Sequence, residues 1–401
     1  MMQSRKVPIH ESADRSAGSS PAAFVNPERL FDSFREMTEI DAPSFRERAF
    51  CDYLKKQLAG LGISAEEDQA GASLCGNCGN LYAFVPASET VGPEKGLPPV
   101  LLSMHMDTVD PACGKKAVRH PDGTITSDGT TVLGADDHAG IAAVLEVLRI
   151  LKENNMPHRP LELLFSAAEE PYCRGSHAFD FSRLKSKEAY VFDLDGPVGT
   201  ASLKAPTILS FCAVFHGRTA HAAFSPEKGI HAIKAAADAV SHVSCGRVGS
   251  TTVNIGTIHG GTADNVVADT CTVTGEVRSF SDDDAKAMCG AVEEQFRTAA
   301  ESDGASVTFG HTDLCTACQT PESAPVVKRF LRACRKAGLA GTLTQTYGGS
   351  DNNVFMQHGI TGIVAAAGMN NCHSRSEYTS LGELTRAADM ILQLISDPDA
   401  E

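Results

Sequence analysis

A series of apolar runs, each followed by a histidine or a carboxylate, most constrains the fold of this chain. Strand-like runs cover residues 80–85, 100–104, 161–165 and 190–192, and they alternate with segments of helical periodicity, such as residues 139–152. Continuous apolar runs are typical of strands buried on both faces. The alternation therefore predicts an α/β fold, in which a mostly parallel sheet is covered by helices on both faces.

The chain has 401 residues, more than a single hydrophobic core usually contains, so we expect two domains. The apolar pattern of residues 204–320 predicts elements in the order β-α-β-β-α-β, which is the split βαβ arrangement of a small ferredoxin-like domain. The pattern of the first domain returns after residue 320, which predicts a discontinuous first domain of residues 24–203 and 321–401. Residues 1–23 are rich in serine and lack an apolar stretch, and we expect them to form a disordered leader.

Composition excludes several classes of partner. The net charge is −15 and no patch of Lys and Arg is visible, which argues against nucleic acid. No apolar segment reaches the roughly 18 residues of a membrane-spanning helix, so we expect no membrane partner. The thirteen cysteines, without a secretory apolar region, favour a reducing compartment and a cytoplasmic protein. Neither a G-x-G-x-x-G motif nor a Walker-type loop is present, which argues against a nucleotide cofactor.

Two helix starts are predicted from capping patterns. Asn26 followed by Pro27 is typical of an N-cap with proline at the first helical position. Ser44 and Glu47 match a capping box, which predicts that a second helix begins directly after Ser44.

Histidines and carboxylates at the ends of separate strand-like runs favour a site for two divalent metal ions, since imidazole and carboxylate together suit zinc, manganese or cobalt. Taken singly, His105 and Asp107 are also typical of a capped strand end, and Asp136-Asp137 of a helix N-cap. Glu169 and Glu170 are adjacent, and side chains alternate in an extended chain, so one of them must face inward. A buried carboxylate there needs a cation or a proton.

Five ordered segments, residues 104–107, 134–140, 168–171, 189–196 and 371–377, resemble the signature blocks of M20 family metallopeptidases, and peptidase T-like members most of all. The resemblance extends from about residue 27 to the C-terminus. It implies a catalytic domain at residues 24–203 and 321–401. It also implies a lid and dimerisation domain at residues 204–320, through which the chain forms a homodimer.

The resemblance also implies roles for individual residues. Asp136 corresponds to a carboxylate bridging two zinc ions, for which Co²⁺ or Mn²⁺ can substitute. The other ligands are His105 and Asp193 on the first ion and Glu170 and His373 on the second. Asp195 remains the alternative to Asp193. Glu169 corresponds to the general base, and Asp107 to the carboxylate that holds the His105 ring.

In the inserted domain, residues 217–221 and 226–229 resemble the lid motif of the family, whose histidine stabilises the substrate oxyanion. This implies that role for His221, and the alternative is a surface histidine. Asn265 and Arg278 correspond to substrate contacts, although Arg278 can instead pair with the carboxylates of residues 282–284. Residues 348–351 are expected to form a pocket-lining turn that acts through its backbone.

Two departures from the family pattern matter. His138 stands where the family usually has lysine. The lid motif also resembles the broad M20 pattern more than that of strict tripeptidases, which leaves tripeptide specificity open.

Two CxxC pairs, Cys75 with Cys78 and Cys315 with Cys318, lie in different predicted domains, so free thiols are expected rather than a Cys₄ zinc site.

The resemblance therefore implies a dinuclear zinc exopeptidase, tripeptidase-like, that removes residues from short peptides by metal-activated water. The alternative keeps the metals and acts on N-acyl or N-carbamoyl amino acids. A silent binding protein on the same fold is a third possibility, but it would show loss of a ligand or of Glu169, and neither is lost.

Overall fold

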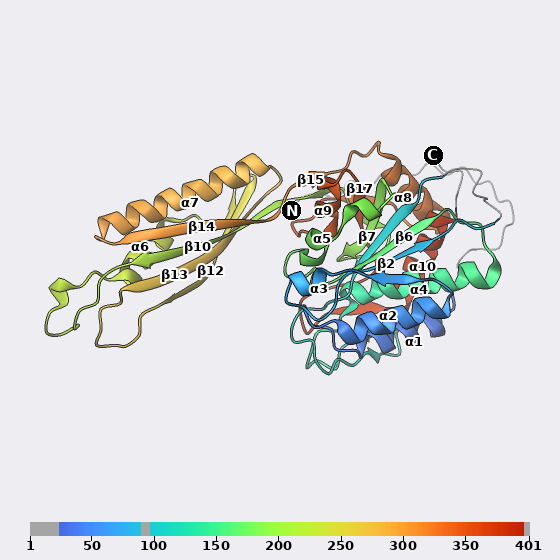
Figure 1. The fold of residues 1–401 in the computed structure, drawn as a ribbon, viewed down its shortest axis with the longest axis horizontal. Coiled ribbons are helices and arrows are strands. Elements are labelled where there is room, and N and C mark those ends of the chain that lie inside the picture. Colours follow the sequence, from blue (N-terminus) through green and yellow to red (C-terminus); the bar gives the residue numbers. More distant parts are fainter. Residues whose placement is uncertain (1–23, 90–96, 397–401) are drawn as a thin grey trace. The chain divides into compact units, whose positions relative to one another are not determined.

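The computed structural model describes residues 24–89 and 97–396, so the predicted leader at residues 1–23 lies outside it. The chain forms two compact units (Figure 1). The large unit contains the described residues up to Leu203, together with Gln319–Thr346 and the chain from Ser350. The small unit contains Lys204–Cys318 and Tyr347–Gly349.

An eight-stranded mixed sheet forms the centre of the large unit. Its strands, in spatial order, are β1 (Ala65–Glu67), β2 (Leu81–Val85), β6 (Leu161–Ser166), β3 (Val100–His105), β7 (Glu188–Leu194), β17 (Thr361–Ala366), β8 (Thr200–Ser202) and β16 (Thr342–Thr344). The central strands β6, β3, β7 and β17 run parallel, while β1, β2 and β8 pair antiparallel with their inner neighbours. The predicted α/β class is confirmed, and the four central strands end at the same edge of the sheet.

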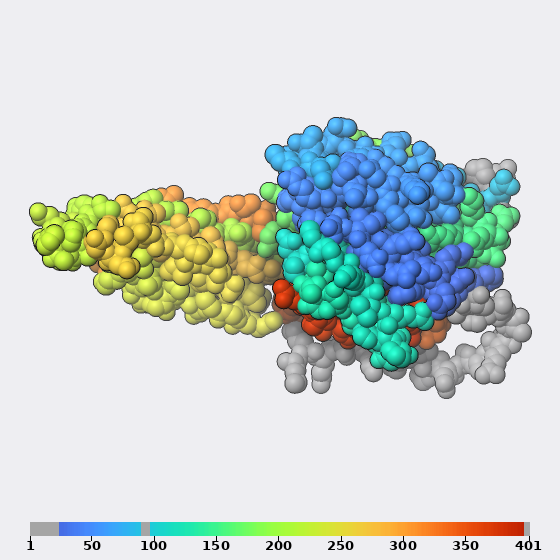
Figure 2. Space-filling view, turned by 90° about the horizontal axis from the view of Figure 1, so that it is seen from below, coloured from blue at the N-terminus to red at the C-terminus, as the bar shows by residue number. Residues whose placement is uncertain are grey.

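Helices cover both faces of this sheet, as predicted. Because successive side chains of a strand point to opposite faces of the sheet, Leu102 and Leu163 lie in one apolar core. Leu101 and Leu164 lie in a second core on the other face. The first core is covered by α1 (Pro27–Thr38), α2 (Arg48–Gly60), α4 (Ala135–Asn154), α8 (Pro325–Lys336) and α10 (Leu381–Ile395). The shorter helices are α3 (Ala70–Ser73), α5 (Arg174–Ala178), α9 (Asp351–Gln357) and the 3₁₀ helix Phe181–Arg183. The N-terminal segments, coloured blue, form much of the surface of this unit in Figure 2.

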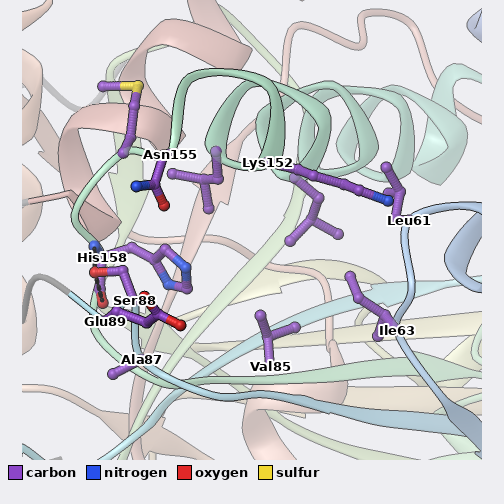
Figure 3. Close-up of a pocket in the computed structure, with 12 residues that line it drawn as sticks. Leu61, Ile63, Val85, Ala87, Ser88, Glu89, Lys152, Asn155 and His158 are labelled. Atoms are coloured by element: carbon purple, nitrogen blue, oxygen red, sulfur yellow. Dashed lines mark hydrogen bonds between the residues drawn. The ribbon is translucent and has the colours of Figure 1, made fainter. Parts of the chain in front are cut away.

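Smaller elements complete the large unit. A three-stranded sheet is formed by β18 (Tyr378–Ser380), β5 (Thr124–Thr126) and β4 (Val118–Arg119). A pocket of about 320 Å³ lies near the C-terminal end of α4, lined by residues that include Leu61, Val85, Lys152 and His158 (Figure 3). None of the predicted site residues lines this pocket. In the part of the chain that the structure describes, none of the helices has the length and apolar character of a membrane span.

The two predicted helix starts have different outcomes. The Asn26 side chain accepts a hydrogen bond from the Arg29 N–H, so the predicted N-cap of α1 is confirmed. The prediction of a capping box at Ser44 and Glu47 is wrong, because α2 begins only at Arg48 and has no side-chain cap. Both side chains bind elsewhere: the Ser44 hydroxyl donates to the Asp107 carboxylate, and the buried Glu47 carboxylate accepts N–H groups of Phe45 and Ala168.

The small unit is built on a five-stranded antiparallel sheet. Its spatial order is β11 (Gly246–Val248), β12 (Thr251–Gly260), β13 (Thr270–Ser279), β10 (Thr207–His216) and β14 (Ser306–Cys315). Helices α6 (Ala232–His242) and α7 (Asp282–Ser302) pack on it around a core that contains Phe211, Phe215 and Phe296. Apart from the edge strand β11, this is the predicted βαββαβ arrangement. The remaining short elements are the 3₁₀ helix Pro226–Lys228 and the paired strands β9 (Lys204–Ala205) and β15 (Cys318–Gln319).

Candidate metal centre and active site

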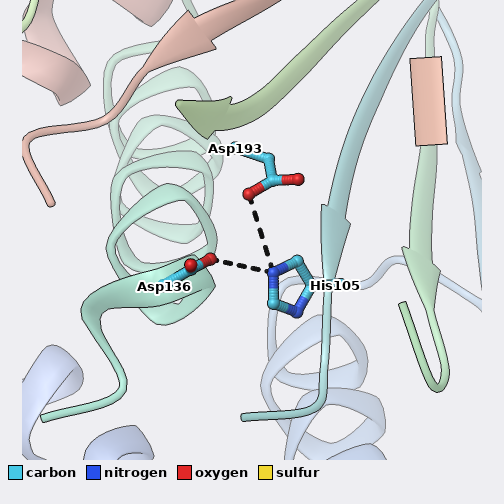
Figure 4. Close-up of side chains that lie close together, drawn as sticks. All are labelled: His105, Asp136 and Asp193. Carbon is cyan, nitrogen blue, oxygen red and sulfur yellow. Dashed lines mark hydrogen bonds and ion pairs between the residues drawn. The ribbon is translucent and has the colours of Figure 1, made fainter. Parts of the chain in front are cut away.

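Three predicted ligands meet where the central strands of the large unit end. His105 is the last residue of β3, Asp193 lies near the end of the parallel strand β7, and Asp136 lies at the start of α4. The His105 Nε2 atom is 3.0 Å from Asp136 Oδ1 and 3.8 Å from Asp193 Oδ1 (Figure 4). Ligands thus come together from three elements because parallel strands present their carboxyl ends at one edge.

A second group shares Asp136 with the first. His373 Nε2 is 2.9 Å from Glu170 Oε2 and 3.3 Å from Asp136 Oδ2. Asp136 therefore directs one carboxylate oxygen to His105 and the other to His373. Within each group, one candidate ligand atom from every residue lies within 4.8 Å of the others. This is the arrangement that a carboxylate bridging two cations requires.

The charges of these groups fit divalent cations. Burial raises the pKa of Glu170, and it raises the pKa of Asp193 to about 7. Hydrogen bonds to Asp136 and Glu170 raise the pKa of His373 to about 11. The buried Glu170 Oε1 atom has no hydrogen-bond partner in the described structure. Buried carboxylates clustered in this way need protons or cations beside them, and divalent cations meet that need.

Asp107 holds the neighbouring turn as well as the His105 ring. The His105 Nδ1 atom is 2.9 Å from the backbone oxygen of Asp107 and 3.5 Å from its carboxylate. Because a carbonyl oxygen only accepts hydrogen bonds, the ring proton lies on Nδ1, which leaves Nε2 free to bind a metal. The Asp107 carboxylate accepts the N–H groups of Glu169 at 2.9 Å and Glu170 at 3.2 Å.

Glu169 is buried on the turn that follows β6. The residue is 7% exposed, and its Oε1 atom accepts a hydrogen bond from the Cys173 thiol at 3.3 Å. Burial and the nearby Asp193 carboxylate raise the pKa of Glu169 well above its usual value. A carboxylate with a raised proton affinity beside two ligand groups is suited to accept and return a proton.

Glu377, the last residue of the segment 371–377, has a structural role that its sequence pattern did not indicate. Its Oε2 atom accepts the N–H groups of Leu133 and Gly134 at 2.8 Å, and its Oε1 atom accepts that of Asp136 at 2.9 Å. Glu377 is buried, and it fixes the backbone that carries the shared ligand. The sequence signal that could have indicated this role is the position of Glu377 in the same short segment as the ligand candidate His373.

We predict that Glu377→Gln weakens metal binding and destabilises the large unit by about 1–3 kcal/mol, because the amide nitrogen cannot accept a buried N–H. Metal content after dialysis and thermal unfolding measure the two effects. The exposed Glu322→Gln serves as the matched control. Retention of metal at the wild-type level in Glu377→Gln would contradict a positioning role.

Two nearby residues lie outside both ligand groups. The Asp195 carboxylate accepts the Cys372 N–H at 3.3 Å, so the structure brings Asp193 rather than Asp195 to His105. His138 is buried and stacks on Phe50 with 4.2 Å between ring centroids. Burial lowers the pKa of His138, which keeps its ring neutral.

In the small unit, His221 is exposed and has a defined tautomer. Its Nδ1 atom accepts the N–H groups of Ala223 and Phe224 at 3.2 Å, so the neutral ring carries its proton on Nε2 and can donate it. The backbone oxygen of Asn265 accepts the Ala222 N–H, which places Asn265 beside this loop.

The Arg278 guanidinium is held by Glu276 and Tyr347. It donates to both carboxylate oxygens of Glu276, at 2.8 and 2.9 Å, and to the Tyr347 backbone oxygen at 2.8 Å. Glu276 lies two residues from Arg278 on the same strand, β13. No disulfide links any of the thirteen cysteines, including both CxxC pairs, all of which lie within the described residues.

In the turn at residues 348–351, the Asp351 side chain is buried and accepts a hydrogen bond from the Ser166 hydroxyl. This contact was not anticipated, because the turn was expected to act through its backbone.

Known proteins resemble this chain over nearly its whole length. The M20_dimer profile, described as a peptidase dimerisation domain, matches residues 206–304, and the profile of peptidase family M28 matches residues 88–210. The chain is 34% identical over 374 residues to the uncharacterized protein YqjE of Bacillus subtilis, covering 93% of this chain and 99% of that protein.

Two solved structures are similar in fold and sequence. The aminopeptidase PepT of Bacillus cereus is 35% identical with a TM-score of 0.83, and the match covers 94% of this chain and 99% of that one. A tripeptidase of Staphylococcus aureus is 32% identical with a TM-score of 0.88, with the same coverage. The chain therefore belongs to the M20 metallopeptidase family and is a peptidase T-like hydrolase of peptide bonds.

Proposed function

We propose that this protein is a dinuclear zinc-dependent exopeptidase that removes the N-terminal residue from short peptides. The observation that carries this proposal is Asp136, which gives one oxygen to each of two histidine- and carboxylate-containing groups. His105, Asp136 and Asp193 would hold one ion, and Asp136, Glu170 and His373 the other. Zinc bound there would supply Lewis acidity and lower the pKa of water, and Co²⁺ or Mn²⁺ can substitute.

The protein's own groups then move the proton. Glu169 accepts the proton of the attacking water and returns it to the departing amine. The Asp107 carboxylate accepts the backbone N–H of Glu169, so the base keeps its position during both proton transfers. His221 would donate its Nε2 proton to the developing oxyanion. Asn265 and Arg278 are proposed to contact the substrate. A substrate carboxylate would have to compete with Glu276 for the Arg278 guanidinium.

The physiological setting is also proposed. The match to a peptidase dimerisation domain supports a homodimer formed through the small unit. Thirteen cysteines that form no disulfide within the described residues support a reducing, cytoplasmic location. The names of the similar structures, an aminopeptidase and a tripeptidase, support short peptides as substrates.

The test is product analysis. Protein loaded with zinc, cobalt or manganese is incubated with di- and tripeptides and with N-acyl and N-carbamoyl amino acids, and products are identified by mass spectrometry. Release of N-terminal residues, absent in Glu169→Ala, is expected. Deacylation alone would replace the peptidase with the amidohydrolase, and bound metal without any turnover would favour the silent binding protein.

We also predict that zinc binding releases protons. At pH 7 the His373 ring, with a pKa of about 11, is protonated, and Asp193, with a pKa of about 7, is partly so. Metal binds the unprotonated forms, so apparent affinity should rise as pH increases through about 7. Calorimetric titrations in two buffers of different protonation enthalpy measure the release. Equal heats in both buffers would contradict it.

A further inference from the structure

A third group of potential metal ligands lies beside Glu169 in the large unit. It consists of the Glu169 carboxylate, the Cys173 thiol and the Asp351 carboxylate, and one ligand atom from each lies within 4.8 Å of the others. Cys173 and Asp351 are each 1% exposed. The proposed peptidase mechanism uses neither of them, and neither belongs to the two groups that share Asp136.

The local backbone explains how these side chains meet. In the turn between β6 and α5, the Cys173 N–H donates to the Glu169 carbonyl oxygen at 2.6 Å. This folds the turn so that the Cys173 thiol reaches the carboxylate of the same glutamate. Asp351 enters from a distant segment, as the first residue of α9.

The Asp351 carboxylate is only partly satisfied by hydrogen bonds. Its Oδ2 atom accepts the Ser166 hydroxyl. Burial raises the pKa of this carboxyl, and its buried Oδ1 atom makes no hydrogen bond of ordinary geometry, although the Ser176 hydroxyl lies close to the carboxylate. A buried carboxylate oxygen without a full partner is costly unless a proton or a cation lies beside it. This is an indication of a ligand that is independent of the thiol.

We propose that Glu169, Cys173 and Asp351 form a third metal site, selective for thiophilic divalent cations such as Zn²⁺ and Cd²⁺. A thiolate ligand favours these ions over Mg²⁺, Ca²⁺ and Mn²⁺. On binding, the Cys173 S–H bond breaks, the proton leaves to solvent, and a sulfur–metal bond forms without any change of oxidation state. Because the ion would occupy Glu169, excess metal would inhibit hydrolysis. The inhibition rests on the proposed function, whereas the binding does not.

Titration of the full-length protein with Cd²⁺ tests this site. The two groups that share Asp136 contain no thiol, so a cadmium–thiolate charge-transfer band in the ultraviolet reports other sites. Wild-type protein is compared with Cys173→Ser, which keeps a hydroxyl donor to Glu169, and with Cys334→Ser. Cys334 is a matched control, because it is also buried in the large unit and contacts Met390 instead.

We expect wild type and Cys334→Ser to bind one more Cd²⁺ than Cys173→Ser in equilibrium dialysis, and to show a correspondingly stronger band. Inhibition by excess Cd²⁺, relative to each variant's own rate, should require at least about tenfold more metal in Cys173→Ser. Equal stoichiometry and equal spectra in wild type and Cys173→Ser would overturn the site. A third ion that binds without inhibiting would overturn the inhibitory role.

Two measurements keep the proposal testable if Cys173→Ser does not fold. Asp351→Asn should lose the same Cd²⁺ ion, and ¹¹³Cd NMR of the wild type should show a resonance for a site with one sulfur and several oxygen ligands. Absence of such a resonance at saturating Cd²⁺ would overturn the site. A third ion in a protein without peptidase activity would support the site and refute only the proposed function.

Discussion

Glu169→Gln is expected to lower kcat for peptide hydrolysis by roughly 10²- to 10⁴-fold, the range that general acid–base catalysis contributes. Glutamine keeps the size and the acceptor oxygen of the side chain, but it cannot take up the proton of the attacking water. Because Glu169 lies in neither of the groups that share Asp136, both metal ions should remain bound. Steady-state kinetics and metal analysis of the same sample measure both effects.

Glu170→Gln is the natural comparison, since the adjacent residue has the same chemistry and a different proposed role. Its carboxylate is 2.9 Å from His373 Nε2, so this variant should lose the ion of the second group. Added metal should therefore restore part of the activity of Glu170→Gln and none of that of Glu169→Gln. Near wild-type kcat in Glu169→Gln would exclude Glu169 as the general base.

Asp136→Asn should weaken the binding of both ions, because its two carboxylate oxygens face different histidines. We expect a loss of at least about 100-fold in affinity at each site, more than removal of an indirect contact usually costs. Metal content after dialysis against a weak chelator provides the measurement. Asp193→Asn and Glu170→Gln should each affect one ion only.

Asp195→Asn is the matched control for Asp136→Asn. Asp195 lies next to the same site, but its carboxylate accepts a backbone N–H of Cys372 and joins neither ligand group. This variant should keep both ions. Loss of metal from Asp195→Asn, or two ions bound to Asp136→Asn at wild-type affinity, would contradict the proposed ligand assignment.

The sequence alone predicted the α/β class and most element positions in the described residues, because apolar periodicity is a local property. Residues 100–104 and 161–165 were predicted as strands and correspond to β3 and β6. The positions of His105 and Asp193 near the ends of parallel strands also follow from this pattern, since such ends meet at one edge of a sheet. The resemblance to M20 peptidases added roles that periodicity cannot supply.

Only the tertiary structure decided which groups hold the site in place. Glu377 binds the Asp136 N–H although the two residues are 241 positions apart. Ser44 and Glu47 match a helix cap in sequence but bind the site turns instead. Asp351, at the start of α9, joins Glu169 and Cys173 of the turn between β6 and α5. Hydrogen bonds between distant segments depend on how the chain packs, and a local sequence pattern does not record that packing.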